Sequence, residues 1–241
     1  LSRLILFLGF IGIWEFTADK GIINAFIFSS PVRLYQTFMD LAKDGVIFMH
    51  IWVTLYETIV AFAIITVVGI IFAILLWCFK GLSDCLEPFM VVLNSLPKSA
   101  LAPMLIVWLG TNTKAIIITA VSVAIFGMII NLYTGFLGID KEKITLIRTL
   151  GGNKWHILCK LIIPGSKKSI ISNMKVNIGL CLVGVIIGEF LAAKKGLGYL
   201  IIYGSQVFKM SYVVLGIVIL CIISTILFAI INIIQKLFLK D

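Results

Sequence analysis

The chain has 241 residues, of which 61% are hydrophobic and only 13% are charged, and its formal net charge is +9. Soluble globular proteins are about half apolar and a quarter charged, so this composition excludes an ordinary water-soluble domain. The positive charge does not indicate nucleic-acid binding, because the basic residues fall between apolar runs and so describe membrane topology.

Six apolar segments are predicted to cross a bilayer as helices, which takes roughly 20 apolar residues each. The runs 59–77 and 213–234 contain no charged residue at all. Helices satisfy their own backbone hydrogen bonds in lipid, so spanning helices are the structure that such runs favour. The first span is the weakest, because Glu15 and Asp19 interrupt it. The predicted spans are 3–23, 51–79, 87–109, 115–137, 172–193 and 212–236.

These spans predict one all-α integral membrane domain over residues 1–241, with the first span and an outer helix in 1–50 and a five-span core in 51–236. Cytoplasmic loops are enriched in Lys and Arg, and the segment 138–175 holds eight of the 20 Lys and Arg residues. We therefore expect this segment, which joins spans four and five, to lie in the cytoplasm together with both termini.

The outer segment 29–50 carries the start signals of a helix. Ser30 can cap a helix whose first residue is Pro31, and Leu34, Phe38 and Leu41 follow at helical spacing. This pattern predicts an amphipathic helix that lies on the outer membrane surface or packs against the outer ends of the spans.

Span three is predicted to be broken, because Pro88, Pro97 and Pro103 all fall within it. Proline removes a backbone donor and bends a helix, so carbonyl groups left unpaired need partners inside protein or a wet cavity. Asn94 and Lys98 lie beside the breaks. The segment is therefore either a wall of a transport pathway or a set of kinks that fit helices together.

The loop 138–171 is the most informative segment of the chain. Its first half predicts a helix to Leu150, which Gly151 and Gly152 would end. Asn153 can cap a second helix through Ile163, and Pro164 disfavours its continuation. The pattern predicts two short helices with a sharp bend between them, outside the membrane.

One face of the second helix is expected to bind a surface. Trp155, Leu158 and Ile162 recur at i, i+3 and i+7 and so share a face. An amphipathic helix of this kind can fill a groove in a partner protein or lie on lipid headgroups, and periodicity alone leaves both open.

The loop resembles the cytoplasmic loop of the permease subunits of binding-protein-dependent ABC importers. The family pattern is Glu-Ala-Ala, three residues, Gly, nine residues, Ile, one residue, Leu-Pro. This chain keeps that spacing with Thr145-Leu146-Ile147, Gly151, Leu161 and Ile163-Pro164, although the Glu-Ala-Ala itself is absent.

Other segments are similar to one branch of that family, the permeases for nitrate, sulfonates, taurine and related small organic solutes. The segments that carry this likeness are Trp14-Glu15, Ser29-Ser30-Pro31, 93–97, 101–110, 188–193 and 196–200.

The resemblance implies a complex in the bacterial plasma (inner) membrane: two permease chains, expected to be a homodimer, two cytoplasmic ATPase subunits and an extracytoplasmic solute-binding protein. The chain contains no phosphate-cradling Gly-x-x-x-x-Gly-Lys-Ser/Thr motif. ATP and Mg are therefore expected in the partner ATPase, and the chain itself is expected to be neither an enzyme nor a cofactor-binding protein. The residues expected to couple it to the ATPase are Gly151, Gly152, Asn153, Trp155, Leu158, Leu161 and Pro164.

Four polar residues in or near spans are candidates for the pathway, since ionisable groups in a membrane usually serve function. They are Asn94, Lys98, Glu57 and Glu189. Glu189 could instead pair with Lys194 or Lys195, or cap neighbouring backbone.

Two other classes of protein compete with the importer. An ion-coupled secondary transporter would suit six spans with a broken helix, but such proteins often show repeated halves and none is visible between 1–120 and 121–241. A membrane enzyme is disfavoured, because His50 and His156 are predicted on opposite sides of the membrane and no cluster of acidic or Cys residues surrounds either.

Overall fold

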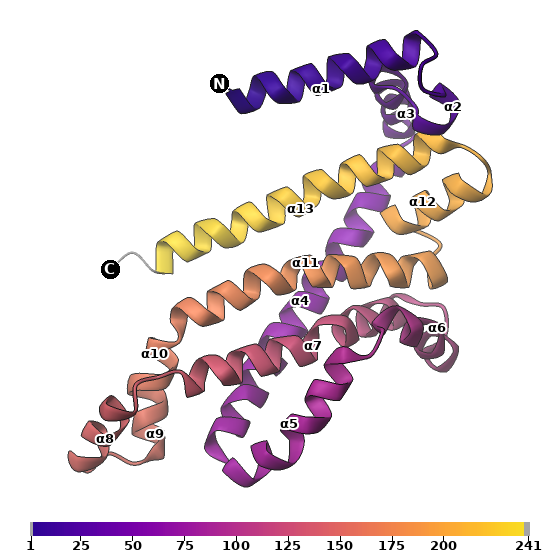
Figure 1. The fold of residues 1–241 in the computed structure, drawn as a ribbon. Coiled ribbons are helices and arrows are strands. Elements are labelled where there is room, and N and C mark those ends of the chain that lie inside the picture. Colours follow the sequence, from indigo (N-terminus) through magenta and orange to yellow (C-terminus); the bar gives the residue numbers. More distant parts are fainter. Residues whose placement is uncertain (1, 239–241) are drawn as a thin grey trace.

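The computed structural model describes residues 2–238, and the side chains of all of these except 2–8, 10, 25 and 238. This part of the chain is a bundle of helices (Figure 1). In chain order the elements are α1 Ser2–Asp19, α2 Ala25–Phe28, α3 Pro31–Lys43, α4 Val46–Cys78, α5 Lys80–Ser95, α6 Lys98–Leu109, α7 Thr113–Leu137, α8 Lys141–Thr149, α9 Lys154–Ile157, the π-helix η1 Leu158–Ile162, α10 Ile163–Gly165, α11 Lys167–Ala192, α12 Leu197–Gln206 and α13 Met210–Phe238.

Four of the described helices, α4, α7, α11 and α13, are long and apolar enough to cross a membrane. The bent pair α5 and α6 makes a fifth span if the two helices are counted together. These five correspond to the second to sixth predicted spans, and α4 begins at Val46, earlier than expected. The all-helical membrane fold predicted from the sequence is confirmed.

The predicted first span corresponds to α1, which the structure shows as a helix of 18 residues. This helix is not among the four that qualify as spans. Its sequence explains the difference, because Arg3, Glu15 and Asp19 place three charged residues in so short a segment. The first predicted span, 3–23, therefore stays a prediction.

The third predicted span breaks at a single point. Helices α5 and α6 meet at an angle of 95°, with Leu96 and Pro97 between them. Pro88 and Pro103 lie inside α5 and α6 without ending them. The helix breaks at Pro97 because Leu96, the residue before it, is extended, with φ −60° and ψ 139°. A proline favours this conformation in the residue that precedes it.

Helices α4, α7 and α11 form the centre of the bundle. Residues such as Ile65, Met128 and Cys181 bring these three helices into one buried cluster. Helices α7 and α11 pack closely, and a Cβ added to Gly184 would lie 2.6 Å from the Cα of Ala120. Small residues at such points let helix backbones pack closely within a membrane.

Helix α3 confirms the predicted amphipathic helix. The Ser30 hydroxyl accepts a hydrogen bond from the Arg33 amide at 3.4 Å, and Pro31 is the first helical residue. Leu34 is buried against a cluster from α4, α12 and α13, with Phe38 and Leu41 beside it. The apolar face of α3 thus packs on the spans.

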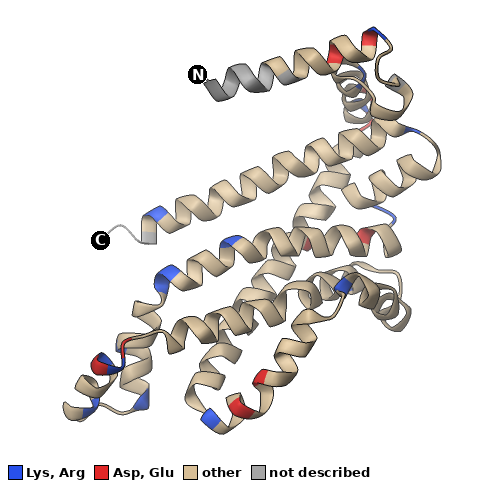
Figure 2. Cartoon of the chain, in the orientation of Figure 1, with Lys and Arg blue, Asp and Glu red and all other residues tan. Residues whose placement is uncertain are grey.

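The two ends of the bundle differ in character. The α8–α9 hairpin lies at the same end as the C-terminal part of α13, whereas α12 and the connection from α11 to α12 lie at the opposite end (Figure 1). Ile163 and Ile234 line a common apolar groove, which confirms that the hairpin end and the end of α13 are neighbours. Many Lys and Arg residues gather around this hairpin end (Figure 2).

Candidate functional site

The predicted hairpin between spans four and five is present, and two glycines shape its bend. Gly151 has a φ of +81°, which side chains other than glycine rarely adopt. A Cβ on Gly152 would lie 2.7 Å from the carbonyl oxygen of Ile147, so this position has no room for a side chain. The Gly152 amide closes the end of α8 by donating to that same oxygen at 2.8 Å.

Asn153 caps the second helix of the hairpin as predicted. Its side-chain oxygen accepts a hydrogen bond from the His156 amide at 2.9 Å, and its own amide donates to Nδ1 of His156 at 3.3 Å. The two residues thus satisfy each other's backbone donors in a capping box. His156 has a structural role here.

The second helix does not end at Ile163, contrary to the sequence-based expectation. The helical path continues from α9 through η1 and α10 to Gly165, and α11 starts at Lys167. Proline cannot donate to the carbonyl four residues earlier and its ring crowds that group. The wider π-helical turn at 158–162 precedes Pro164 and accommodates this defect.

The predicted binding face of α9 divides into two parts. Leu158 and Ile162 are 1% and 0% exposed and belong to the core formed with α4 and α7. Trp155 is 66% exposed, and it lies near the hairpin bend. The interior of this protein thus already buries two of the three side chains, and of the three only Trp155 is exposed to a partner or to lipid.

Two exposed residues of the hairpin escaped the sequence analysis. Leu146 and Leu150 on and just after α8 are 59% and 78% exposed. Their i, i+4 spacing next to the Gly-Gly bend was the available signal. Together with Trp155 they form what we call the hairpin patch: Leu146, Leu150 and Trp155. Leu161 is only partly buried, and Pro164 is exposed.

The hairpin is also tied to the end of a span. The ammonium group of Lys154 lies 3.5 Å from the carbonyl oxygen of Cys78, the last residue of α4. Ile157 is 1% exposed in the same core as Leu158. The side of the hairpin away from the patch is thus packed against the spans.

At the other end of the bundle, Glu189 on α11 organises the start of α12. Its Oε1 accepts a hydrogen bond from the Thr54 hydroxyl at 2.6 Å, and its Oε2 accepts one from the Gly198 amide at 2.5 Å. The Thr54 hydroxyl in turn accepts from the Leu197 amide at 2.8 Å. Glu189 is 0% exposed, and it caps backbone, one of the three roles left open by the sequence, while Lys194 and Lys195 are exposed.

His50 extends the same junction. Its Nδ1 accepts a hydrogen bond from the Gly196 amide at 2.9 Å, and its ring lies over Tyr199 with centroids 6.0 Å apart. A side chain on Gly196 would collide with the Glu189 carboxylate. Sequence reasoning missed this junction, because its members come from α4, α11 and α12 and share no local pattern.

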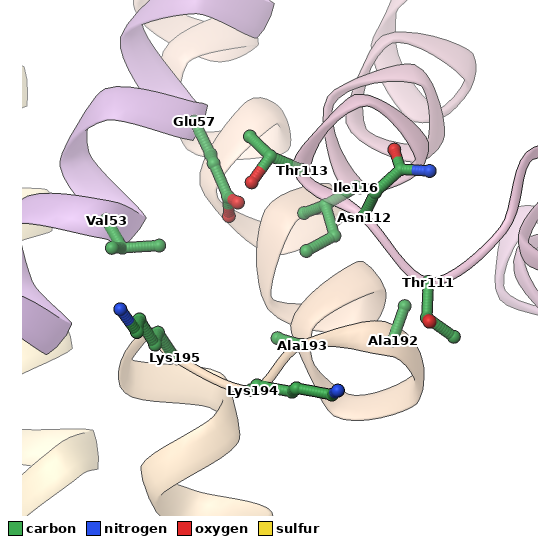
Figure 3. Close-up of a pocket in the computed structure, with 10 residues that line it drawn as sticks. All are labelled: Val53, Glu57, Thr111, Asn112, Thr113, Ile116, Ala192, Ala193, Lys194 and Lys195. Atoms are coloured by element: carbon green, nitrogen blue, oxygen red, sulfur yellow. The ribbon is translucent and has the colours of Figure 1, made fainter.

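Glu57 is the second candidate acid, and it lies within electrostatic range of Glu189. It is 1% exposed, and both of its carboxylate oxygens are buried. The side chains of Glu189 and Thr113 are its polar neighbours. Glu57 borders a cavity of about 210 Å³ between α4, the start of α7 and the α11–α12 connection. Figure 3 shows its side chain directed toward Thr113 and Ile116.

The other pathway candidates lie elsewhere. The Lys98 ammonium donates to the carbonyl oxygen of Asn94 at 2.6 Å and to its side-chain oxygen at 3.2 Å, across the break between α5 and α6. This pair replaces backbone bonds that Pro97 interrupts. The structure thus brings Glu57 and Glu189 together and Asn94 and Lys98 together, as two separate pairs.

A helical membrane domain with a broken span and a packed hairpin carrying exposed apolar side chains defines a permease-type transport subunit. Residues 65–240 match the family described as binding-protein-dependent transport system inner membrane component. The match covers more than half of the chain, and the chain therefore belongs to this family. It is a multi-pass permease of a binding-protein-dependent ABC importer of the bacterial inner membrane, and the ATPase is a separate subunit.

Individual relatives agree with this assignment. The chain is 26% identical over 231 residues to SsuC of Bacillus subtilis, a permease protein named for aliphatic sulfonates, across 95% of this chain and 83% of SsuC. It is 26% identical to the formylaminopyrimidine transport permease protein ThiX of Halalkalibacterium halodurans, across 83% of this chain and 79% of ThiX.

Its fold resembles a chain of the MetNI methionine ABC transporter in inward-facing conformations, with a TM-score of 0.72 and 18% identity, across 80% of this chain and 96% of that one. The resemblance predicted from the sequence motifs is confirmed.

Proposed function

We propose that two copies of this chain form the membrane path of an importer for small organic solutes, and that the α8–α9 hairpin is its contact with the ATPase. The observation that carries this proposal is the hairpin patch. Leu150 and Trp155 expose most of their apolar surface on a hairpin whose other face is buried. Such exposed apolar groups are typical of protein contact sites.

The packing of the hairpin explains how it could transmit force. Ile157, Leu158 and Ile162 fix α9 and η1 to the core made with α4 and α7, so a displacement of the hairpin moves these spans with it. ATP-driven closure of the ATPase shifts the permease between inward-open and outward-open states if the patch docks with different free energy in each.

The same proposal assigns the other components. ATP and Mg bind to two cytoplasmic ATPase subunits, and an extracytoplasmic solute-binding protein delivers the solute to the end of the bundle that holds α12. The hairpin and both termini lie in the cytoplasm, an orientation supported by the basic residues around the hairpin end (Figure 2).

The transported solute belongs to a class of small organic molecules, for which aliphatic sulfonates are the leading candidates. SsuC, named for that class, is 26% identical to this chain over 231 residues. ThiX is 26% identical to it over 199 residues and is named for formylaminopyrimidine. Nitrate, taurine and related solutes stay within the proposed range.

The coupling role is tested by Gly151→Asp, with Gly21→Asp as a matched control. Both glycines have positive φ, +81° and +67°, and a Cβ on either meets nothing within 4 Å. The backbone strain is thus similar, and only the location differs. We expect Gly151→Asp to lose co-purification with the ATPase subunit and Gly21→Asp to keep it. Normal co-purification and transport by Gly151→Asp would refute the assignment of the hairpin.

A further inference from the structure

An apolar groove runs between α11 and α13, and the proposed coupling mechanism does not use it. The two helices lie side by side and share one buried cluster (Figure 1). Beside this contact their side chains line a hollow of about 530 Å³. A smaller hollow continues it toward the hairpin end, and Leu182 and Ser224 border both. We call the two hollows together the α11–α13 groove, which extends from Lys175 at the hairpin side to Ile187.

The groove has the length and the lining of a site for a lipid chain. The stretch of α11 from Lys175 to Ile187 rises about 18 Å, and one leaflet of bilayer hydrocarbon is about 15 Å thick. Between its ends the lining is apolar apart from the hydroxyl groups of Ser224 and Thr225. Gly179 keeps the groove open, because a Cβ there would meet nothing within 4 Å. One acyl chain of a phospholipid can therefore lie along it.

Lys175 places a positive charge at the hairpin side of the groove. Its side chain is half-buried, and its ammonium group lies over the ring of Phe228, 5.7 Å from the centroid. Among the described residues no carboxylate lies within ion-pair distance of this ammonium group. Helix α13 contains no acidic residue, and Glu189, the acid of α11, lies near the opposite end of that helix. A charged group within a span calls for a partner of opposite charge, so the site favours an anionic ligand.

The ammonium group of Lys175 is placed to reach the lipid headgroups. The basic residues of α11 all lie in the half of the helix next to the hairpin (Figure 2). Side chains on a helix tilt toward its N-terminus, which in α11 is the hairpin end. A lysine just inside the hydrocarbon can therefore extend its charge out to the interface. Lys168 is exposed two turns earlier on the same face of α11, so two lysines follow one another there.

We propose that the α11–α13 groove binds an anionic phospholipid of the cytoplasmic leaflet, with its phosphate at Lys168 and Lys175 and one acyl chain along the groove. The choice of leaflet rests on the proposed function, which places the hairpin end in the cytoplasm. Two lysines without an acid beside them favour a headgroup of net negative charge over phosphatidylcholine, whose choline cancels the charge of the phosphate. Helix α11 follows the hairpin through α10, so the lipid lies against a helix that a displaced hairpin would move.

The headgroup is tested with two phospholipids that have the same acyl chains, phosphatidylglycerol and phosphatidylcholine. Each is titrated onto the purified chain in detergent, and native mass spectrometry counts the bound lipid. We expect phosphatidylglycerol to bind about tenfold tighter or more, because each lysine near the phosphate contributes roughly fivefold. Lys175→Gln should lower this affinity about fivefold, and Lys175→Arg should restore it by restoring the charge. Lys143→Gln makes the same change of charge on the exposed hairpin and should leave the affinity unchanged.

The acyl-chain part of the site is tested by Gly179→Phe, which fills the groove and should weaken binding of both lipids about tenfold or more. Gly12→Phe on α1 is the matched control, since a Cβ on this helical glycine also meets nothing within 4 Å. Thermal unfolding without added lipid should be the same for all variants and the wild type. If Lys175→Gln unfolds early, Lys168→Gln at an exposed position repeats the headgroup test, with the same expected loss.

Equal affinity for the two lipids, an unchanged preference in both lysine-to-glutamine variants of α11, or unchanged binding by Gly179→Phe would each overturn the proposal. Loss of the dimer by Gly179→Phe with lipid binding intact would also overturn it, and would make the groove an interface between two copies. The titration contains no ATPase and no solute, so a failure of the proposed importer does not change its result. A reversed topology would overturn the choice of leaflet.

Discussion

At the scale of single residues, the junction around Glu189 joins three helices through one hydroxyl group. Thr54 donates to Glu189 on α11 and accepts from the Leu197 amide at the start of α12. Each of these groups is buried, so each needs a partner within the protein. The hydroxyl of Thr54 therefore contributes more to the stability of the fold than the hydroxyl of a threonine that bonds only within its own helix.

Thr54→Val should destabilise the protein by about 2 kcal/mol or more, because it leaves a buried carboxylate oxygen and a buried amide without partners. Thr58→Val is the matched control, since the Thr58 hydroxyl donates only to the Thr54 carbonyl of its own helix at 2.7 Å. We expect this variant to change stability by less than about 1 kcal/mol. Thermal unfolding in detergent measures both, and equal losses would contradict the role of Thr54.

The sequence predicted the types of site residue better than their arrangement. Asn153 as a cap and Gly151 as a bend follow from local signals, and the structure has both. The burial of Leu158 and the exposure of Trp155 do not follow from the sequence, because helical periodicity does not distinguish a face that packs on the chain's own core from one that binds a partner. The link between Thr54, Glu189 and Leu197 spans well over a hundred residues and leaves no pattern in the sequence.

At the scale of elements, α7 and α11 approach most closely at Gly184. A Cβ there would lie 2.6 Å from the Cα of Ala120 on α7, and backbone cannot move aside cheaply. The apolar runs predict both helices, but not the contact between them, which depends on one small residue whose partner is on another helix. The effect of a proline is also not predictable from the sequence alone, because Pro97 breaks its helix and Pro164 does not.

Gly184→Ala should therefore force α7 and α11 apart and cost about 1–3 kcal/mol. Gly179→Ala on the same helix is the control, since a Cβ there meets nothing within 4 Å. Alanine favours a helix over glycine by about 1 kcal/mol, so this variant should be neutral or slightly stabilised. The unfolding midpoints of the purified variants measure this difference. A Gly184→Ala protein as stable as the wild type would contradict the close packing of α7 against α11 at this position.

Leu150 tests the hairpin as an element. Its side chain is 78% exposed, so Leu150→Asp should leave the fold of the isolated chain intact while it weakens attachment of the ATPase about tenfold or more, through the loss of an apolar contact. Ile22→Asp, at a side chain that is 69% exposed at the opposite end of the bundle, should leave both the fold and the affinity for the ATPase unchanged. Titration of the ATPase onto immobilised permease measures the affinity. An unchanged affinity for Leu150→Asp would exclude the hairpin patch as the contact with the ATPase.

At the scale of the whole molecule, the orientation in the membrane follows from charge. Lys143 in the hairpin and Lys194 beyond α11 lie at opposite ends of the bundle and are both exposed. In a variant without the five native cysteines, Lys143→Cys should react with an impermeant maleimide only after cell lysis. Lys194→Cys should react in intact cells. The opposite result would invert the proposed topology.

The fold class and family of the whole chain could be predicted from composition, apolar runs and the spacing of the loop motif. The status of α1 could not, because an 18-residue helix with three charges lies at the limit of what can span a bilayer alone. The cavity beside Glu57 could not be predicted either, because its walls come from three distant parts of the chain.

The most direct test of the central claim is uptake by proteoliposomes that contain this chain and its ATPase subunit, with ATP inside and the loaded solute-binding protein outside. We predict accumulation of solute that requires internal ATP, is lost with Gly151→Asp and persists when proton and sodium gradients are collapsed. Uptake by the chain alone, driven by an ion gradient without ATP, would contradict the account and make the protein an ion-coupled transporter.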